Sequence, residues 1–241
     1  NLAVRHCRGD YLIFCDGDTI PRKDFVESHL KNARPKTFLS GAGIDVPKHV
    51  YKTFTDSQIM ENMVFRPCFL THAWPEARKH SLRFQSGILE KSLNIVTWRY
   101  CVLRGANFSL WRNDIESVNG FDESYGYGSE DRELGVRLRN NGVASRWLKF
   151  SLIQLHLSHE KAYIDPKIVR QQRWKIRKLF FTRKKQLHQG LATACERSLS
   201  SEDRRYTYTL SETMTHAPPL LRFEPSQPTE VRAQTKRKRA A

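Results

Sequence analysis

Residues 11–18 read "YLIFCDGD", an apolar run that ends in two aspartates separated by one glycine. Because the apolar residues are continuous rather than alternating, the run predicts a strand covered on both faces, as in an α/β sheet. Residues 21–34, "PRKDFVESHLKNAR", predict a helix, since proline suits the first helical turn. This order places Asp16 and Asp18 at the carboxyl end of a strand, where α/β sheets bind ligands.

Asp16 and Asp18 are candidate metal ligands. Residues two apart in a strand share one side, so both carboxylates can face one point, and Gly17 lets a ligand approach the backbone. Two anions together are unfavourable unless a cation joins them. Oxygen donors suit a hard ion, Mg²⁺ or Mn²⁺, that keeps positions open for phosphate oxygens. The alternative is an ordinary acidic turn, because Asp and Gly are common turn residues.

The composition describes a globular chain with a strong positive charge. Its 241 residues suit one large domain or one domain with appendages, and 39% hydrophobic residues are enough for a core. The 41 Lys and Arg against 25 Asp and Glu give a net charge of +16, which points to nucleic acid, an anionic membrane or a phosphorylated substrate. The five cysteines are scattered and form no C-x-x-C pair, which argues against a disulfide framework or a zinc ribbon. Cys15 and Cys101 are expected to be small core residues, and a reducing cytoplasm fits best.

The rest of the first 160 residues alternates between strand and helix signals. Strands are predicted at 37–46, 100–112 and 145–159, and helices at 56–65, 112–118 and 129–142. In the last helix, Ser129 is a plausible N-cap and Gly142 suits the C-terminal cap.

Glu130 and Asp131 open that helix after a glycine-rich stretch in which Gly126 and Gly128 can deliver the helix start into a cleft. Acids in the first helical turn complement the helix dipole, so a capping role explains them without any chemistry. The functional alternative is that one carboxylate is a general base that is ionised at pH 7.

His156 and His159 lie near the end of the last predicted strand. Histidines three apart can both reach one metal ion if the chain bends there, although such pairs are more often structural or exposed.

These motifs, taken in this order, resemble those of a known enzyme family. The stretches at 2–21, 103–142 ("LRGANFSLWRNDIESVNGFDESYGYGSEDRELGVRLRNNG") and 156–159 ("HLSH") resemble family-2 glycosyltransferases. The similarity is greatest to a subgroup with a galactosyltransferase-like carboxy-terminal half, and it spans residues 1 to about 165. It implies an α/β fold of the Rossmann-like GT-A type, a mixed sheet flanked by helices. The family's first strands, which bind the base and ribose, do not match any part of this sequence, so the chain is expected to be a piece of a longer enzyme.

The resemblance also implies a metal site. In the family the two D-x-D acids, here Asp16 and Asp18, hold Mn²⁺ or Mg²⁺ on the diphosphate of a nucleotide-sugar donor. A histidine after the last core strand completes the ligand shell. His159 fits that place best, with His156 as the second choice.

The same resemblance implies roles for Glu130 and Asp131. Asp131 corresponds to the base that deprotonates the acceptor hydroxyl, and Glu130 faces the acceptor. The implied reaction transfers a sugar from a nucleotide-sugar donor, with a UDP-sugar as the first choice, to a hydroxyl of a glycan or lipid-linked saccharide. The configuration at the anomeric carbon is expected to invert. The residues expected to contact substrates are Asp16, Gly105, Asn107, Tyr127 and Gly128. Tyr127 replaces the subgroup's usual Trp and keeps an aromatic wall for stacking a sugar, so the replacement bears on the choice of acceptor.

Three segments are predicted: a partial glycosyltransferase core at 1–160, a basic amphipathic helical extension at 161–199, and a low-complexity, disordered tail at 200–241. Residues 161–185 hold ten Lys or Arg against one Asp, interleaved with apolar residues. That pattern fits a helix lying on the anionic inner face of a membrane, and equally a solvated basic face packed on the core. The alternative function is a nucleic-acid-binding module without catalytic activity, because the basic run and the terminal "KRKR" also suit phosphate backbones.

Overall fold

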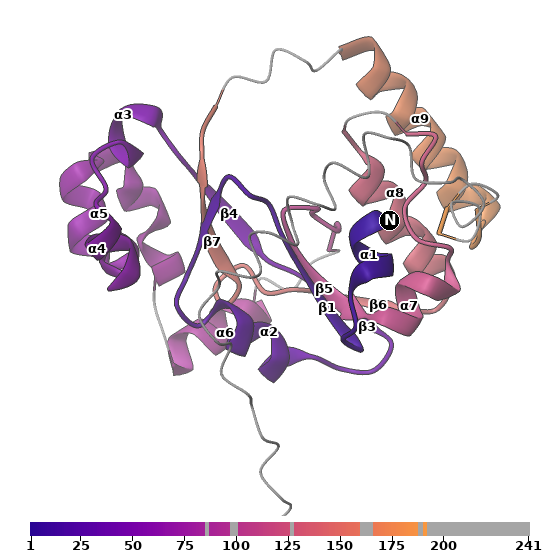
Figure 1. Cartoon of the computed structure of the whole chain (residues 1–241), viewed down its shortest axis with the longest axis horizontal. Coiled ribbons are helices and arrows are strands. Elements are labelled where there is room, and N and C mark those ends of the chain that lie inside the picture. The colour runs from indigo at the N-terminus through magenta and orange to yellow at the C-terminus, as the bar shows by residue number, and fades with distance from the viewer. Residues whose placement is uncertain (85–86, 97–100, 126–127, 160–165, 188–189, 192–241) are drawn as a thin grey trace, which may run out of the picture. The chain divides into compact units, whose positions relative to one another are not determined.

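The computed structural model describes residues 1–84, 87–96, 101–125, 128–159, 166–187 and 190–191 (Figure 1). The predicted tail at 200–241 lies outside these residues. The strands are β1 Tyr11–Cys15, β2 Thr19–Pro21, β3 Thr37–Ser40, β4 Ala42–Val46, β5 Asn107–Trp111, β6 Ala144–Trp147 and β7 Ile153–Leu157. The α-helices are α1 Leu2–His6, α2 Phe25–Asn32, α3 Lys48–Tyr51, α4 Asp56–Met60, α5 Pro67–Ala73, α6 Ile88–Val96, α7 Arg112–Ser117, α8 Glu130–Asn140 and α9 Pro166–Thr182. Two 3₁₀ segments are η1 Met63–Phe65 and η2 Pro75–Phe84.

The first sheet has the strand order β1-β5-β3-β6. Strand β5 runs antiparallel to both β1 and β3, and β6 runs parallel to β3. The strands β1, β3 and β6 therefore share one direction, and their carboxyl ends lie at the same edge of the sheet as the amino end of β5. The mixed sheet and its flanking helices confirm the predicted α/β class.

The second sheet has the order β2-β7-β4, with β7 antiparallel to β2 and parallel to β4. Its register sets His156 opposite Thr19 on one side and Asp45 on the other. Residues more than a hundred positions apart thus meet through strand pairing alone.

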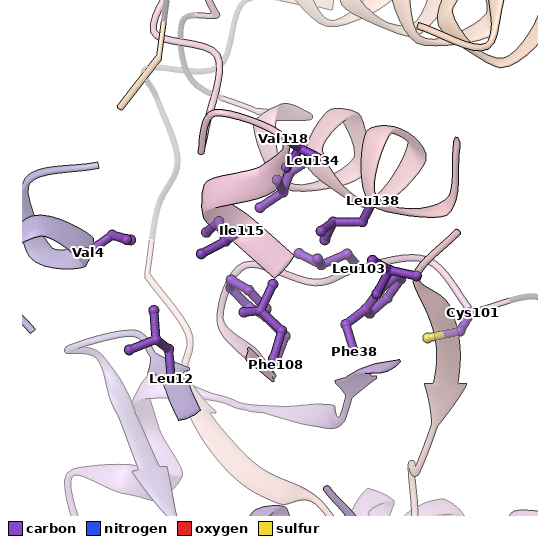
Figure 2. Close-up of a cluster of buried hydrophobic side chains, with 12 residues drawn as sticks. Val4, Leu12, Phe38, Cys101, Leu103, Phe108, Ile115, Val118, Leu134 and Leu138 are labelled. Atoms are coloured by element: carbon purple, nitrogen blue, oxygen red, sulfur yellow. The ribbon is translucent and has the colours of Figure 1, made fainter. Parts of the chain in front are cut away.

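Two large apolar clusters hold these sheets, beside a smaller one of Leu39, Leu148 and Leu152. One packs α1, α7 and α8 on the first sheet around Leu12, Phe38, Phe108, Leu134 and Leu138, all buried (Figure 2). The other packs the helices from α3 to α5 on β4 and β7 through a cluster of buried side chains. These are Ile44, Val46, Val50, Val64, Phe65, Leu70, Trp74, Ala77, Ile153 and Leu155.

Two single-strand predictions were wrong in the same way. The 37–46 stretch forms β3 and β4, in different sheets, and the 145–159 stretch forms β6 and β7. Gly41 makes the first break possible, because a Cβ there would lie 2.3 Å from the Asn107 side chain and 2.4 Å from the Leu152 carbonyl oxygen. The chain can switch sheets only where no side chain fills that space.

Burial also corrects two predictions and shows which side chains α2 buries. In β1 only Leu12 is buried, so the strand is not covered on both faces within the described residues. Cys15 is exposed, whereas Cys101 is buried as expected, and burial raises the pKa of its thiol to about 11. On α2 the buried side chains are Phe25 and His29, while the neighbouring apolar residues face solvent.

Among the helices that the structure describes, none combines the length and the apolar character that crossing a membrane requires.

Candidate active site

Asp18, His156 and His159 converge on one point, which makes them a candidate metal centre. The Nε2 atoms of His156 and His159 lie 3.1 and 2.9 Å from Asp18 Oδ2. One ligand atom from each of the three residues lies within 4.8 Å of the others. Strand pairing builds this cluster, because Leu157 N donates to the carbonyl of Asp18 and so fixes the turn after β1 against the end of β7.

A divalent cation fits this cluster. The Oδ1 atom of Asp18 is buried and has no hydrogen-bond partner among the described residues, although a buried carboxylate oxygen normally has one. His156 is mostly buried, with 13% of its side chain exposed, while Asp18 and His159 are 36% and 40% exposed. One oxygen and two imidazole nitrogens with an open side suit a transition-metal ion such as Mn²⁺ that leaves positions for further ligands.

Asp16 lies apart from this cluster. The D-G-D stretch directly follows the carboxyl end of β1 and forms the turn that leads into β2. Asp16 is exposed, and its carbonyl accepts a hydrogen bond from the Thr19 hydroxyl at 2.7 Å. The metal-ligand role of Asp18 gains a geometric basis, whereas that of Asp16 stays a prediction.

Asp45 is a residue that the sequence did not single out. Its Oδ1 lies 2.8 Å from Nδ1 of His156, on the ring edge opposite Asp18. A neutral imidazole carries one N–H, so donation from Nδ1 to Asp45 leaves the Nε2 lone pair directed at the Asp18 side. A carboxylate behind a ligating histidine is the usual way in which proteins fix its tautomer and ring orientation.

Asp131 is held at the edge of the first sheet. Its Oδ2 accepts a hydrogen bond from the backbone N–H of Gly105, just before β5, at 3.0 Å, and its Oδ1 accepts one from Arg132 N at 2.6 Å. Gly135 permits this approach, because a Cβ there would lie 2.8 Å from Cβ of Leu103. A glycine inside a helix costs roughly 0.5–1 kcal/mol, and here it lets α8 pack closely against the segment that leads into β5.

Glu130 lies beside Asp131 in a less satisfied environment. Its Oε2 is buried without a hydrogen-bond partner among the described residues. Burial raises the pKa of the Glu130 carboxyl, and the charges of Asp131 and Asp16 raise it further, against the lowering effect of nearby backbone N–H groups. The influence of Asp16 also means that the turn after β1 and the start of α8 lie within electrostatic range of each other.

The backbone before α8 adopts left-handed conformations at Gly128 and Ser129, with φ of 91° and 94°. Glycine tolerates this readily, whereas serine does so at a cost of order 1–3 kcal/mol. Ser129 occupies the predicted N-cap position, but its side chain makes no capping hydrogen bond. Gly142, at φ 81°, follows the end of α8 and suits the C-terminal cap, as predicted.

Asn107, another predicted substrate contact, lies between the two sheets. Asn107 is 1% exposed, and its Nδ2 donates to the carbonyls of Ala42 and Leu152 at 3.4 and 3.1 Å. This side chain ties the two sheets together, so the structure gives it a structural task. Tyr127 lies outside the described residues.

A pair on α8 holds the loop that precedes the acids. Arg137 and Glu133 are fully buried, with Arg137 Nε 2.6 Å from Glu133 Oε1. The Arg137 guanidinium also donates to the carbonyls of Val118 and Gly120, at 2.6 and 2.7 Å. The sequence suggested no role for this pair, because i, i+4 charges on a helix are usually exposed.

Comparison with known proteins supports the predicted class. A family model described as the N-terminal domain of galactosyltransferase matches residues 92–160, the segment that carries β5, α8 and His159. The chain is 28% identical over 188 residues to the "Uncharacterized glycosyltransferase YfnE" of Bacillus subtilis, a match that covers 66% of this chain and 47% of YfnE.

Among solved structures, one similar chain is the mannosyltransferase PcManGT from Pyrobaculum calidifontis in complex with GDP-Man and Mn²⁺. It has 13% identity and a TM-score of 0.40, covering 89% of this chain and 58% of PcManGT. Because the match covers 47% of YfnE, the chain spans about half the length of that curated relative. The sequence matches confirm the resemblance to glycosyltransferases that the motifs indicated.

Proposed function

We propose that this protein takes part in a metal-dependent transfer of a sugar from a nucleotide-diphosphate donor to a hydroxyl of a glycan or lipid-linked saccharide. The single observation that supports this most is that the carboxyl end of β1, which leads to Asp18, is paired with the amino end of β5, which Gly105 precedes. Asp18 with its two histidines follows β1, and Asp131 is bonded to the amide of Gly105 just before β5. A transferase of this kind needs a place for the leaving diphosphate and a base for the acceptor, side by side.

Asp18, His156 and His159 would hold the cation. When bound, Mn²⁺ or Mg²⁺ neutralises the charge that builds on the leaving diphosphate. The two imidazoles favour Mn²⁺ over Mg²⁺, because Mg²⁺ prefers oxygen ligands. Asp16, whose charge reaches Glu130, is proposed to lie at the donor side of the same site.

Asp131 is proposed as the general base. Its carboxylate removes the proton of the acceptor hydroxyl, and the acceptor oxygen forms a bond to the anomeric carbon as the bond from that carbon to the diphosphate oxygen breaks. One in-line displacement inverts the anomeric configuration. The Gly105 amide holds Asp131 in place throughout, since a base must remain within hydrogen-bond reach of the proton that it removes.

Glu130 is proposed to position the acceptor. A sugar hydroxyl that bound to its buried Oε2 would satisfy an oxygen that has no hydrogen-bond partner among the described residues. The raised pKa of Glu130 is consistent with a polar group that awaits a partner. Gly128 contributes by allowing the tight turn that presents this carboxylate.

The finer assignments are part of the same proposal. The family-2 type rests on the order of the motifs. A cytoplasmic site of action at the inner membrane face rests on α9, in which exposed Trp174, Phe180 and Phe181 lie among basic residues.

A donor screen tests this function. The full chain is incubated with UDP- and GDP-sugars, with Mn²⁺, with Mg²⁺ or with EDTA, and release of the nucleoside diphosphate is measured. The proposal expects release from one donor class that requires a divalent metal and is faster with Mn²⁺. Release that is equally fast in EDTA would contradict it.

A further inference from the structure

A cavity of about 690 Å³ lies between α9 and the loop that leads towards the acid pair. Its volume falls within the roughly 300–1,000 Å³ of ordinary ligand pockets. Loop residues Asp122, Ser124 and Tyr125 form one wall, and side chains of α9 and the segment after it form the other. The lining from the second wall is Trp174, Lys175, Lys178, Leu179, Thr182, Lys184 and Leu187. Helix α9 lies alongside α8 in Figure 1.

The lining combines aromatic faces with positive charges. The Nζ atom of Lys175 lies 5.5 Å from the ring centroid of Tyr125, and Nζ of Lys178 lies 5.8 Å from that of Trp174. The Trp174 side chain is 64% exposed, a large apolar surface that the described part of the fold leaves open to a ligand. Aromatic rings provide flat faces on which ligands can stack, and lysines provide mobile cationic donors to oxyanions.

The net charge of the cavity selects for an anion. Among the described residues of the lining, Lys175, Lys178 and Lys184 contribute three positive charges, and Asp122 contributes the one acidic side chain. Part of the Asp122 charge is engaged locally, because its Oδ1 accepts a hydrogen bond from Ser124 N at 2.9 Å. A neutral ligand would gain stacking but no charge complementarity, whereas a ligand with ring faces and carboxylate or sulfate groups would gain both.

The cavity is joined to the acceptor side of the site by the chain itself. Tyr125 precedes Glu130 by five residues. Helix α9 also lies next to the turn before α8, since a Cβ added at Gly128 would lie 3.9 Å from Cγ2 of Val169. The wall of the cavity thus continues along the chain into the start of α8, and the sugars further along an acceptor bound at Asp131 would extend towards it.

We propose that this cavity is a subsite for an acidic glycan, so that the acceptor is a saccharide chain bearing carboxylate or sulfate groups. This inference rests on the proposed transfer and names the class of its acceptor. Trp174 and Tyr125 stack on sugar rings, and Lys175 and Lys178 bind the acidic groups.

A second cavity, about 590 Å³ between α2 and α6, does not compete for this role. It is lined by acids and bases alike, among them Glu27, Glu90, Lys91 and Arg146, so it has no net preference for an anion. Its Glu90 carboxylate already accepts a hydrogen bond from the Ser151 hydroxyl.

The test is a binding measurement on the full chain without donor or metal. The probes are an oligomeric polyuronate, a neutral glucan of equal length, and phosphatidylglycerol vesicles. We compare the wild type with Lys175→Gln/Lys178→Gln and with Trp174→Ala. The matched control is Arg170→Gln/Arg177→Gln, which removes two charges from the same helix at positions that do not line the cavity.

The polyuronate is expected to bind and the neutral glucan to bind at least tenfold more weakly. Loss of the two lysines should weaken polyuronate binding by roughly tenfold or more, as expected for two charge-assisted contacts. The arginine control should change it by less than about threefold, because charges outside the cavity act only through the screened field. Trp174→Ala should weaken binding to a similar extent at low and at high salt, since stacking is not screened.

Equal weakening by the lysine and arginine pairs would overturn the subsite, because binding would then follow total charge. Vesicle binding that depends on Lys175 and Lys178 without polyuronate binding would assign the cavity to a membrane instead and would also overturn it. If the glycan binds as expected but no sugar is transferred, the acidic-glycan site stands and the proposed transfer fails. If transfer is intact while binding ignores the lysines, the subsite fails alone.

Discussion

The proposed metal cluster and the acid pair are assembled in opposite ways. Asp18 and His156 are 138 residues apart and meet because β2 pairs with β7. Glu130 and Asp131 are neighbours at the start of one helix. The cluster therefore depends on the register of a sheet, whereas the pair depends on local helix geometry and on how closely α8 packs against the segment before β5.

Because of this difference, substitutions in the cluster and in the acid pair should impair different functions. A change at the cluster should alter metal binding and leave α8 intact, and a change at the acid pair should leave metal binding intact. Variants that violate this separation would show that the two groups are not distinct parts of one site.

The largest expected effect is at Asp18. Asp18→Asn keeps the size of the side chain and removes the charge that attracts the cation. Metal-dependent donor hydrolysis by the full chain should fall roughly a thousandfold or more. Asp56→Asn, which changes an exposed acid in the first turn of α4, is the matched control and should have no effect. Hydrolysis near the wild-type rate in Asp18→Asn would remove the cluster from the mechanism.

Substitutions of Glu130 and Asp131 should affect only the transfer of the sugar to the acceptor. Asp131→Asn should lower transfer to the acceptor by roughly a hundredfold to ten-thousandfold while Mn²⁺ affinity and donor affinity stay unchanged. Glu130→Gln should instead raise the acceptor KM more than it lowers kcat. Steady-state kinetics of both variants distinguish the roles, and a full loss in Glu130→Gln beside an active Asp131→Asn would reverse them.

Asp45 allows metal binding to be tested without changing a proposed metal ligand. Asp45→Asn should weaken Mn²⁺ binding by roughly tenfold to a hundredfold, because it removes the group that orients His156 without removing a ligand. Calorimetric titration with Mn²⁺ measures this without reference to activity. An unchanged affinity would mean that the exposed Asp45 carboxylate is only a surface partner of the imidazole.

The smallest effect concerns stability at Glu130. Because the pKa of Glu130 is raised in the folded protein, folding favours its protonated form, and the ionised carboxylate destabilises the fold at neutral pH. The stability that this group contributes to the wild type should therefore fall as the pH rises from the ordinary pKa of a glutamate, about 4.5, through the raised pKa of the folded protein.

Glu130→Gln should thus increase the melting temperature at pH 7, by the equivalent of roughly a few tenths of a kcal/mol, because water screens a half-exposed group. The gain should disappear below about pH 4.5, where the carboxyl is neutral in both states. A helix cap predicts the reverse, a loss of stability at pH 7, so thermal melts at two pH values decide between the readings.

Local patterns explain why much of the fold could be predicted from the sequence. The apolar run before Asp16 and the amphipathic stretch after Ser129 specify a strand and a helix through their own residues. The positions where the chain changes sheets could not be predicted, because the break at Gly41 is required by Asn107 and Leu152, which lie far along the sequence.

The same limit applies to the site. The sequence identified Asp18, His156 and His159 as candidates because of their residue types, and the structure brings them together. It could not identify Asp45, since only the pairing of β4 with β7 sets that residue beside His156. Asp16 is not one of the three residues of this cluster, and its predicted role as a metal ligand stays a prediction.

His156 and His159 are proposed to hold a metal ion together with Asp18. Pulsed electron paramagnetic resonance of Mn²⁺ bound to the full chain, with ¹⁴N- and ¹⁵N-labelled histidine, tests it directly. We expect a nitrogen coupling that changes with the isotope, weakens in either single histidine-to-alanine variant and vanishes in the double variant. Bound Mn²⁺ without any histidine nitrogen coupling, or with a coupling that survives loss of both side chains, would contradict the account.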